Sequence, residues 1–343
     1  MNRLKIGDIA RLANVSKGTV SKVINNYPGI NADTRKRILR VIADHSYAPD
    51  NSAQQLAFRK TRTIGVLIPH EPEHSLNGAY WSSLVTSISV ETRANDYAVE
   101  LLFAETDEEV DTLVHAVVRR SIVDGLIISA ELGRSRFLTP LQARSVPYVV
   151  IGRPEEPAPF SVDIDNEAAS RAATEHLLNA GYRRVAYISG PRDYPHNTAR
   201  SAGYHGALSA AGVDYSHVSY LRYEHPQDVC AAISELVKDR ATRPDAFLVG
   251  AGGDFMFDVL SALHEHELSP PDVGFVTFDD YRFLDFLTPP ITAVRQPMAG
   301  IGREAVRMLI SLLNGAPPER QLVLLPAELV VRNSSTVRAA DGA

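Results

Sequence analysis

The chain has 343 residues, of which 45% are hydrophobic, and its formal net charge is −6. This composition is sufficient for a full hydrophobic core in two or three domains and excludes a disordered tail protein. The single cysteine, Cys230, excludes an internal disulfide and a zinc-binding cysteine cluster, which fits a reducing compartment. The N-terminus lacks the apolar stretch of a secretory signal, and no stretch approaches about 18 apolar residues without a charge. We therefore expect a cytoplasmic protein without membrane contact.

Charge is distributed unevenly along the chain. Residues 1–60 carry 11 Lys and Arg against 4 Asp and Glu, a net charge of +7, whereas residues 61–343 carry 24 against 37, a net charge of −13. A compact basic end on an acidic body is typical of a head that meets DNA phosphates while the body stays away from them. A merely solvated charged face has the same composition, so the charge alone leaves both interpretations open.

The first predicted elements are two short helices separated by a tight turn at residues 13–15. Hydrophobic side chains expected on one side of the first helix are Ile6, Ile9, Ala10 and Leu12. Ser16 is a favourable N-cap for the second helix. The side chains expected on its buried face are Val20, Val23 and Ile24. Its other positions are small, polar or basic and leave a hydrophilic face free to enter a groove: Lys17, Gly18, Ser21, Lys22 and Asn25.

A third helix is predicted after the turn at residues 26–29, with Asn31 as its cap. Its core positions are Ile38, Val41 and Ile42, and its basic positions are Arg35, Lys36, Arg37 and Arg40. Two short helices about a turn, braced by a third, form a helix-turn-helix in which the second helix reads the DNA. A three-helix packing module with solvated charges is the alternative at this point.

From residue 63 onward, short β-branched runs alternate with helical stretches. The predicted strands form a first set, 64–68, 99–103, 125–128 and 148–151, and a second set, 185–188, 246–249 and 273–276. Such runs between amphipathic helices are typical of parallel strands in a βα series. The sequence therefore predicts two doubly wound halves with a ligand site in the cleft between them, at the carboxyl ends of the strands.

The N-terminal segments resemble the DNA-binding head of the LacI/GalR family of repressors. The matching residues are Asp8-Ile9-Ala10, Ala13-Asn14-Val15-Ser16, Thr19-Val20-Ser21-Lys22-Val23-Ile24-Asn25 and Tyr47-Ala48-Pro49. The resemblance implies that base edges in the major groove are read by Lys17, Gly18 and Lys22. It also implies contacts with the DNA backbone, which position the head without specifying sequence, by Ser16, Thr19, Ser21, Asn25, Thr34 and Tyr47.

Three residues depart from the family pattern. Lys5 stands where a threonine commonly caps the first helix, so the start of that helix is expected to fray. Gly18 offers no side chain for base readout and weakens its helix by about 1 kcal/mol relative to alanine. Lys22 replaces the more usual arginine and lacks the bidentate fork that matches a guanine edge. We therefore expect an unusual operator preference.

Residues 50–57 are predicted to form a short helical octet, which has too few apolar groups to fold alone. The octet resembles the hinge helix of the family, which orders on DNA, pairs with its dimer mate and wedges a leucine into the minor groove. The resemblance implies minor-groove contacts by Ala53 and Leu56.

The body resembles the periplasmic-binding-protein type I fold of the same family. The matching stretches are residues 162–166, 180–186, 200–204, 278–280, 289–292, 295–297 and 328–332. The expected fold is a small all-α helix-turn-helix domain joined to an α/β body of two doubly wound subdomains. The expected parts are a DNA-binding head (1–48), a hinge helix and linker (49–61), and an effector-binding and dimerisation domain (62–343). The N-subdomain of that domain is expected at about 62–162 and 293–321, and the C-subdomain at about 163–292 and 322–335, with crossings at Ser161–Asp165 and Thr292–Val294.

The resemblance also implies effector contacts in the cleft. Arg200 and Asp279 supply a charged donor and a charged acceptor, which suit a polyhydroxylated ligand or a nitrogen-rich base. Tyr80 and Trp81 occupy an aromatic site after the first strand, where a ring can stack on a sugar or a purine. Further candidates are Ser129, Asp165, Asp254 and Gln296. Structural ion pairing for the charged pair and plain core packing for the aromatic pair are the alternatives.

Two departures bear on the effector. Gly252-Gly253-Asp254 replaces a frequent Asn-Asp pair, and Gly152 stands where sugar-binding members can carry an acidic side chain. Both changes remove hydrogen-bonding groups that sugar hydroxyls would use. A carbohydrate or sugar derivative is the family expectation, and a nucleoside or purine is the alternative.

An enzyme and a secreted solute-binding protein are the rival classes. His264 and His266 have i,i+2 spacing, which faces opposite sides of a helix, and the chain has neither a P-loop nor a G-x-S-x-G motif. A secreted binding protein would need a signal peptide in place of the basic head. We therefore expect a non-enzymatic, allosteric repressor without cofactor or metal, which binds a pseudo-palindromic operator in double-stranded DNA as a homodimer. An activator would share every feature named.

Overall fold

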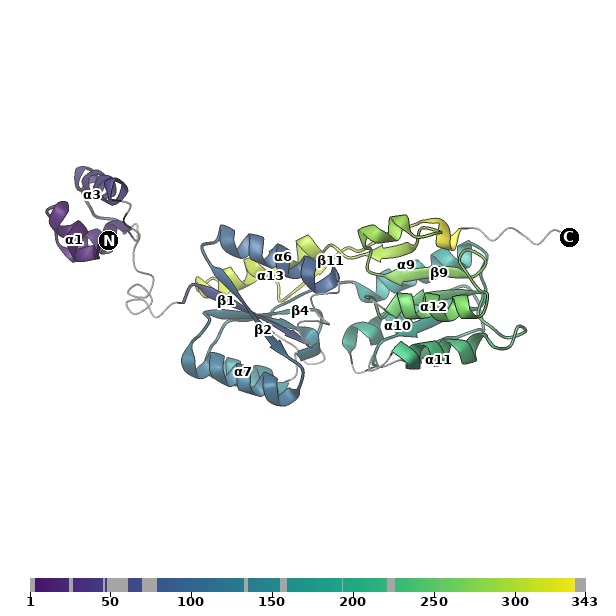
Figure 1. Ribbon diagram of the computed structural model, residues 1–343. Helices are drawn as coiled ribbons and strands as arrows, with labels where there is room; N and C mark the ends of the chain where they lie inside the picture. Colours follow the sequence, from purple (N-terminus) through teal and green to yellow (C-terminus); the bar gives the residue numbers. More distant parts are fainter. Residues whose placement is uncertain are drawn as a thin grey trace. The chain divides into compact units, whose positions relative to one another are not determined.

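The structure is a computed structural model that describes residues 4–24, 27–45, 47, 61–69, 79–132, 135–154, 159–192, 194–220, 226–253 and 255–336. Among the predicted site residues, those outside the described residues are Asn25, Ala53, Leu56 and Asp254. The chain divides into two compact units, Met1–Arg62 and Thr63–Ala343, called here the head and the body (Figure 1).

The head contains the three predicted helices, α1 (Ile6–Leu12), α2 (Lys17–Ile24) and α3 (Ala32–Asp44). Its buried core consists of Ile9, Ala10, Ala13, Val20, Val23 and Ile38. The prediction that Leu12 lies on the buried side of α1 is wrong, because Leu12 is 52% exposed. Leu12 is the last residue of α1, and Ala13 in the following turn fills the core one helical turn after Ile9.

The starts of the head helices are held by side chains close to them. Ser16 Oγ accepts a hydrogen bond of 3.1 Å from the backbone N–H of Thr19, and Asn31 accepts one of 2.8 Å from Asp33. Both are N-caps, as predicted. At α1 the carboxylate of Asp8 accepts a hydrogen bond of 2.9 Å from the backbone N–H of Lys5. The helix start that was expected to fray is therefore tied by an acid from its own first turn.

The described part of the body contains two six-stranded sheets. The first has the order β11-β5-β4-β3-β1-β2 and the second β12-β10-β9-β8-β6-β7. We call the sheet of β1 with its helices the first lobe, and the sheet of β6 with its helices the second lobe. The first-lobe elements are β1 (Thr63–Pro69), α6 (Ala79–Ala94), β2 (Ala98–Ala104), α7 (Asp107–Arg120), β3 (Gly125–Ser129), η1 (Ala130–Leu132), α8 (Ser135–Ala143), β4 (Tyr148–Ile151), β5 (Ser161–Ile164), α13 (Met298–Leu313) and β11 (Leu322–Leu325).

The second-lobe elements are α9 (Asn166–Asn179), β6 (Val185–Ser189), α10 (Pro195–Ala210), β7 (His217–Tyr220), α11 (Pro226–Val237), β8 (Ala246–Val249), α12 (Phe255–Glu265), β9 (Gly274–Phe278), η2 (Arg282–Phe286), β10 (Thr292–Arg295), β12 (Glu328–Val330) and η3 (Asn333–Ser335). All seven predicted strands are present, and their pairing is parallel, as in β1 with β2 and β3. No described helix of either unit is both long and apolar enough to cross a membrane.

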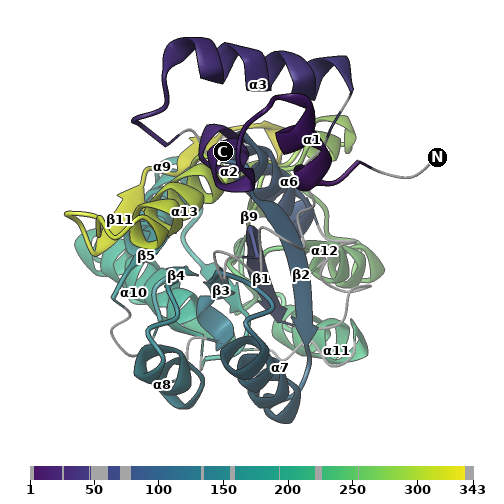
Figure 2. The ribbon, with the colours of Figure 1, turned by 90° about the vertical axis from the view of Figure 1, so that its left-hand side faces the viewer.

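Each sheet buries both faces against helices. In the first lobe, α6 and α13 cover one face and α7 and α8 the other (Figure 2). Strand β1 shows the alternation that this requires, since Ile64, Val66 and Ile68 pack toward α6 and α13 while Leu67 packs toward α7 and α8. In the second lobe α9 and α10 pack on one face and α11 and α12 on the other.

Within the described residues the chain crosses between the lobes after β5, after β10 and after β11. This strand order moves the expected subdomain edges near residues 162, 292 and 321 to the ends of β5, β10 and β11. β5 and β11 pair with each other in the first sheet, whereas β10 pairs with β9 in the second. Each of these strands pairs along its whole length before the chain leaves its sheet. The crossings after β10 and β11 therefore come at Pro297 and Pro326, the first prolines beyond the two strands.

Candidate functional site

The surface of α2 has the two faces that the sequence predicts. Val20 and Val23 are buried in the head core, whereas Lys17, Gly18 and Lys22 are exposed. The exposed positions therefore form a polar and basic face on a short helix that is fixed by its neighbours. Such a face has the dimensions and charge that enter the major groove of DNA.

Five of the predicted backbone-contacting residues lie within the described part of the head. Ser16 and Thr19 share a hydrogen bond of 2.8 Å between their hydroxyl groups. Ser21 and Thr34 are half-buried, and Tyr47 packs against the head core after α3. Each of these side chains has a hydroxyl that can donate to a phosphate oxygen.

Two of the basic side chains of α3 have structural partners within the head. Arg35 donates a hydrogen bond of 2.7 Å to the carbonyl of Tyr27, and Arg37 donates one of 3.0 Å to the carbonyl of Ala13. The second contact ties α3 to the turn between α1 and α2. Part of the positive charge that the sequence shows is therefore used to hold the helix-turn-helix together.

In the body, Arg200 is a buried cation on α10. Its Nε donates a hydrogen bond of 2.7 Å to Asn166 and its guanidinium one of 2.6 Å to the carbonyl of Gly250. The guanidinium also lies 3.9 Å from the centre of the Phe278 ring. Three fixed contacts give the guanidinium a single position, in which it acts as a pre-organised charged donor.

Asp279 follows β9 directly and is buried, with a left-handed backbone φ of +68°. Burial raises the pKa of this carboxyl, and the nearby charge of Arg200 and the hydrogen bonds from Gln296 and Tyr281 oppose the rise. The bond from Gln296 is 2.6 Å long. Gly252 is required beside it, because a Cβ there would collide with the Asp279 carboxylate. The glycine that departs from the family pattern thus makes room for the acid.

Asp163 is a buried acid that sequence reasoning missed. It lies near the end of β5 and accepts hydrogen bonds from the backbone N–H groups of Arg153 (3.0 Å) and Ile164 (2.7 Å) and from Asn166 (3.1 Å). Burial raises its pKa against the effect of these donors and of Arg200. Asn166 therefore links Asp163 of the first lobe to Arg200 of the second.

Asp165, the acid that the sequence singled out nearby, is exposed. Its carboxylate accepts a hydrogen bond of 2.9 Å from the backbone N–H of Ala168 and caps α9. The period of two along β5 places Asp163 and Asp165 on the same side of an extended chain, so the pattern alone does not distinguish them.

Ser129, another predicted effector contact, is buried at the end of β3, and its hydroxyl lies 3.4 Å from the backbone nitrogen of Glu131.

Tyr80 and Trp81 start α6 and form an edge-to-face pair with ring centres 5.5 Å apart. Both rings pack against the hydrophobic core of the body. Burial raises the pKa of Tyr80, and the charges of Asp163, Asp279 and Glu131 raise it further. The Tyr80 hydroxyl is therefore under the influence of acids from both lobes.

His196 is a further group that the sequence did not select for binding. It lies in the first turn of α10 and packs against the ring of Tyr194. Burial and the charge of Arg200 lower its pKa to about 4, while Glu131 opposes the shift. The imidazole is therefore neutral at physiological pH and offers one donor and one acceptor.

The cleft cluster is thus made by both lobes. Its charged and polar members are Tyr80, Glu131 and Asp163 from the first lobe and His196, Arg200 and Asp279 from the second. The three acids lie at or just after the carboxyl ends of parallel strands, Asp163 in β5, Glu131 after β3 and Asp279 after β9. Among the described residues, no group of three or more His, Cys, Asp or Glu has an arrangement for a metal ion.

A helix-turn-helix head on a two-lobed α/β body with a buried polar cluster between its lobes defines a class of ligand-responsive DNA-binding regulators. Residues 5–50 match the family described as "Bacterial regulatory proteins, lacI family", and residues 174–335 match "Periplasmic binding protein-like domain". The HTH-type transcriptional regulator CelR of Thermobifida fusca is 33% identical over 336 residues, which cover 95% of this chain and 96% of that protein. The chain therefore belongs to the lacI family of bacterial transcriptional regulators.

Other comparisons agree with this family. Catabolite control protein A of Priestia megaterium is 29% identical over 335 residues, or 96% of this chain and 98% of that protein. A structure described as a transcriptional regulator CelR–cellobiose complex superposes with a TM-score of 0.72 at 30% identity, covering 97% of this chain and all (100%) of that one. The lac repressor dimer bound to operator and the anti-inducer ONPF shares the fold, with a TM-score of 0.78 at 24% identity and 98% and 100% coverage. The expected fold class and family are confirmed, and these relatives are regulators rather than enzymes.

Proposed function

We propose that the chain acts in the cytoplasm as a repressor, which binds a pseudo-palindromic operator as a homodimer with an affinity set by a carbohydrate in the cleft of the body. The observation that carries this proposal is the polar cluster drawn from both lobes. A ligand that contacts Asp163 on one side and Arg200 and Asp279 on the other interacts with both lobes at once. Such a ligand necessarily favours one arrangement of the lobes over others.

The chemistry of the cluster supports a carbohydrate. Buried carboxylates accept hydrogen bonds from hydroxyl groups, a fixed guanidinium donates them, and the rings of Tyr80 and Trp81 offer a face to sugar C–H groups. The relative CelR has a structure with cellobiose. A nucleoside or purine is the second candidate, because the aromatic pair and the neutral imidazole of His196 would also suit a base.

In the head, the proposed base-reading residues are Lys17, Gly18 and Lys22, and the proposed backbone contacts are Ser16, Thr19, Ser21, Asn25, Thr34 and Tyr47. The proposed hinge (49–61) links the head (1–48) to the effector domain (62–343) and inserts Ala53 and Leu56 into the minor groove; these two residues lie outside the described part of the chain. Leu56→Ala is expected to lower operator affinity strongly while leaving effector binding unchanged. An unchanged operator affinity, or selected DNA sites without two-fold symmetry, would contradict the hinge and dimer part of the proposal.

The proposed mechanism is a population shift between two lobe arrangements. Effector binding changes the angle between the lobes, the dimer then moves its hinge segments, and operator affinity changes by the difference in effector affinity between the two arrangements. A repressor that the effector releases from its operator is what the family resemblance leads us to expect. Activation differs only in where the operator lies relative to the promoter.

The deciding experiment follows the emission of Trp81, the single tryptophan of the chain, during titration with sugars, sugar phosphates, nucleosides and purines. A saturable change with the sugars, accompanied by a change in operator affinity for the same compound, is expected. Saturation with nucleosides alone would replace the carbohydrate by the second candidate. Direct calorimetry on the same panel detects a ligand that leaves the emission of Trp81 unchanged.

A further inference from the structure

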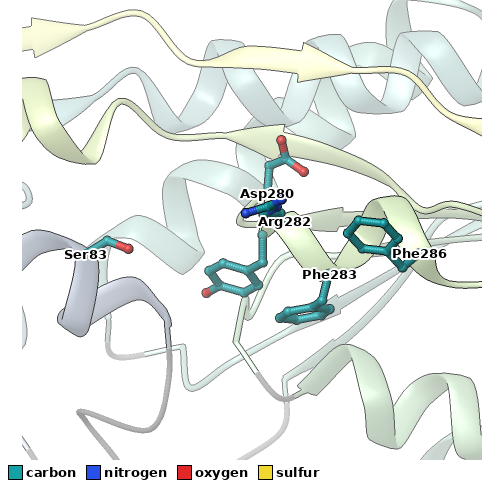
Figure 3. Close-up of a pocket in the computed structure, with 6 residues that line it drawn as sticks. Ser83, Asp280, Arg282, Phe283 and Phe286 are labelled. Carbon is teal, nitrogen blue, oxygen red and sulfur yellow. The ribbon is translucent and has the colours of Figure 1, made fainter.

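Two features outside the cleft cluster call for a functional explanation. The first is a cavity of about 540 Å³ in the body, lined by Ser83 and by residues in and beside η2 (Figure 3). Its acid, Asp280, is already paired with Arg295 at 2.6 Å and Arg332 at 2.8 Å, so the cavity does not single out a class of ligand. The second feature is a glycine of the head, Gly7, and its surroundings have a specific chemical consequence.

Gly7 is the second residue of α1, where a glycine weakens the helix relative to alanine. A glycine in such a place is usually required by a left-handed backbone or by the close approach of another backbone. Gly7 is not among the residues with a positive φ. Among the described residues, no backbone atom of another element lies within 4 Å of the position that a Cβ of Gly7 would take. Neither usual reason therefore accounts for this glycine.

The side chain of Lys17 occupies the space that a methyl group on Gly7 would need. A Cβ at Gly7 would lie 2.9 Å from Lys17 Cε and 3.5 Å from Lys17 Nζ, and the first distance is shorter than two carbon atoms tolerate. Lys17 is the first residue of α2 and precedes the buried Val20 by three positions, so it stands at the border of the exposed face of α2. Its stem therefore crosses from α2 to α1 over Gly7.

This contact gives the Lys17 ammonium a direction. Lys17 is exposed, and a lysine stem of four carbons can otherwise take many paths over a protein surface. Packed across Gly7, the stem runs from α2 toward α1. In a helix-turn-helix the first helix crosses the DNA backbone and the second helix reads base edges. The Lys17 ammonium is therefore held at the boundary between these two helices rather than along the exposed face of α2.

We propose that Gly7 is a specificity-determining residue of the head, which acts through Lys17. Its missing side chain fixes the path of the lysine stem over α1, and this path decides which base edge the ammonium reaches. The inference rests on the proposed function, in which Lys17 reads bases. Because lysine donates to the O6 and N7 acceptors of guanine, we expect a guanine at the base pair that Lys17 reads. Gly7 itself has no side chain with which to contact DNA and is a positioning residue.

A purely structural role for Gly7 makes a different prediction. The obstacle to a Cβ at Gly7 is the far end of a flexible side chain, whereas at Gly203 it is the backbone carbonyl of Glu167. Alanine at Gly7 therefore displaces the Lys17 ammonium and leaves the packing of the head intact. The higher helix propensity of alanine favours the fold as well. Gly7→Ala should thus change base preference without lowering the melting temperature, and a structural glycine would do the reverse.

The test is a double-mutant cycle on the full-length chain. A library of random double-stranded DNA selects the preferred site of the unmodified chain, and all single-base variants of that site are then bound to Gly7→Ala, Lys17→Ala and the double variant. Gly7→Ala is expected to lower discrimination about fivefold at the base pair that Lys17→Ala also relaxes, and to leave the other positions within about twofold. In the Lys17→Ala background the same change should have no further effect. Leu12→Ala, at an exposed apolar position of α1, is the matched control and should leave base preference unchanged.

An equal effect of Gly7→Ala with and without Lys17 would overturn the inference, because the glycine would then act independently of the lysine. Unchanged base preference would overturn it too, and a lower melting temperature in that case would make Gly7 a structural residue only. If Lys17→Ala relaxed no base pair, the assignment of Lys17 to base readout would fail and the inference with it, while the unmodified chain would still select a site. If the unmodified chain selected no site at all, the proposed function of the head would itself be wrong.

Discussion

Gln296 Nε2 donates a hydrogen bond of 2.6 Å to Asp279 Oδ1, and this bond joins the residue after β9 to the residue after β10. Asp279 is the buried acid of the second lobe in the cleft, and Gln296 directly precedes Pro297, where the chain crosses to the first lobe. The proposed effector contact is thus one hydrogen bond away from a crossing segment. We therefore expect that displacement of Asp279 by a ligand would act directly on this crossing segment.

Asp163 and Asp165 are expected to differ in effector binding. Asp163→Asn should lower effector affinity about tenfold, because the buried carboxylate loses an acceptor within the cleft cluster. Asp165→Asn is the matched control, since asparagine caps a helix about as well as aspartate and the side chain is exposed. Calorimetric titration with the identified effector measures both. A larger loss of effector affinity for Asp165→Asn than for Asp163→Asn would show that Asp165, the residue predicted from the sequence, is the effector contact.

Lys22 and Lys36 are expected to contribute to DNA binding in different ways. Lys22→Ala should cost about 1–2 kcal/mol on the preferred operator and relax the preference at one base pair, because this side chain lies on the exposed face of α2. Lys36→Ala, an exposed cation on α3, should weaken binding to all sequences alike and reduce the salt dependence. Binding to a library of single-base operator variants at two salt concentrations separates these outcomes. Uniform weakening by Lys22→Ala would remove it from base readout.

His196 is expected to make stability depend on pH. Its pKa is lowered from 6.5 to about 4 in the folded chain. Between these values the unfolded chain binds more protons at this site, so the free energy of unfolding rises with pH. The loss between pH 7 and pH 5 should be on the order of 1–2 kcal/mol.

His196→Gln isolates this contribution, because the variant retains hydrogen-bonding capacity but does not titrate. Urea unfolding of both chains at pH 7, 6 and 5 gives the difference between them, in which the other titrating groups cancel to first order. The stability of the unmodified chain should fall by about 1–2 kcal/mol relative to the variant as the pH falls from 7 to 5. Parallel curves over this interval would show that the imidazole has an ordinary pKa.

Gly203 and Gly206 on α10 are expected to respond to alanine substitution to different extents. A Cβ at Gly203 would collide with the backbone carbonyl of Glu167 on α9, which cannot move without shifting a helix. Gly203→Ala should therefore destabilise the body by about 2–4 kcal/mol. At Gly206 the nearest atoms are the end of the Arg171 side chain, which can swing away, so the higher helix propensity of alanine should keep the change within about 1 kcal/mol. Thermal unfolding of the two variants provides the comparison, and similar losses would mean that α9 and α10 adjust to each other.

The sequence was sufficient for those parts of the fold that depend on periodicity. Val20 and Val23 recur at helical spacing and are buried, and Ile64, Val66 and Ile68 alternate along β1 as a strand between two helical layers must. The edges of the lobes were not accessible in this way. Residues 322–325 and 328–330 are both short extended runs, and only their hydrogen-bond partners assign them to different sheets.

The site could be predicted where one residue carries the chemistry, and less well where several residues share it. Arg200, Asp279 and Gln296 came from the resemblance, and the structure brings Arg200 and Gln296 beside Asp279. Asp163 and His196 were missed because their importance comes from burial by distant elements. Glu131 of the first lobe acts on His196 of the second only because the two lobes meet. No window of sequence contains that information.

The crossings after β5, β10 and β11 mean that neither lobe is a continuous piece of the chain. β11, the edge strand of the first sheet, is synthesised after nearly all of the second lobe, so the first sheet remains incomplete until residues 322–325 have been made. A protease that cuts one crossing leaves the lobes joined by the others. Neither lobe can therefore be expressed alone as one uninterrupted segment of the gene.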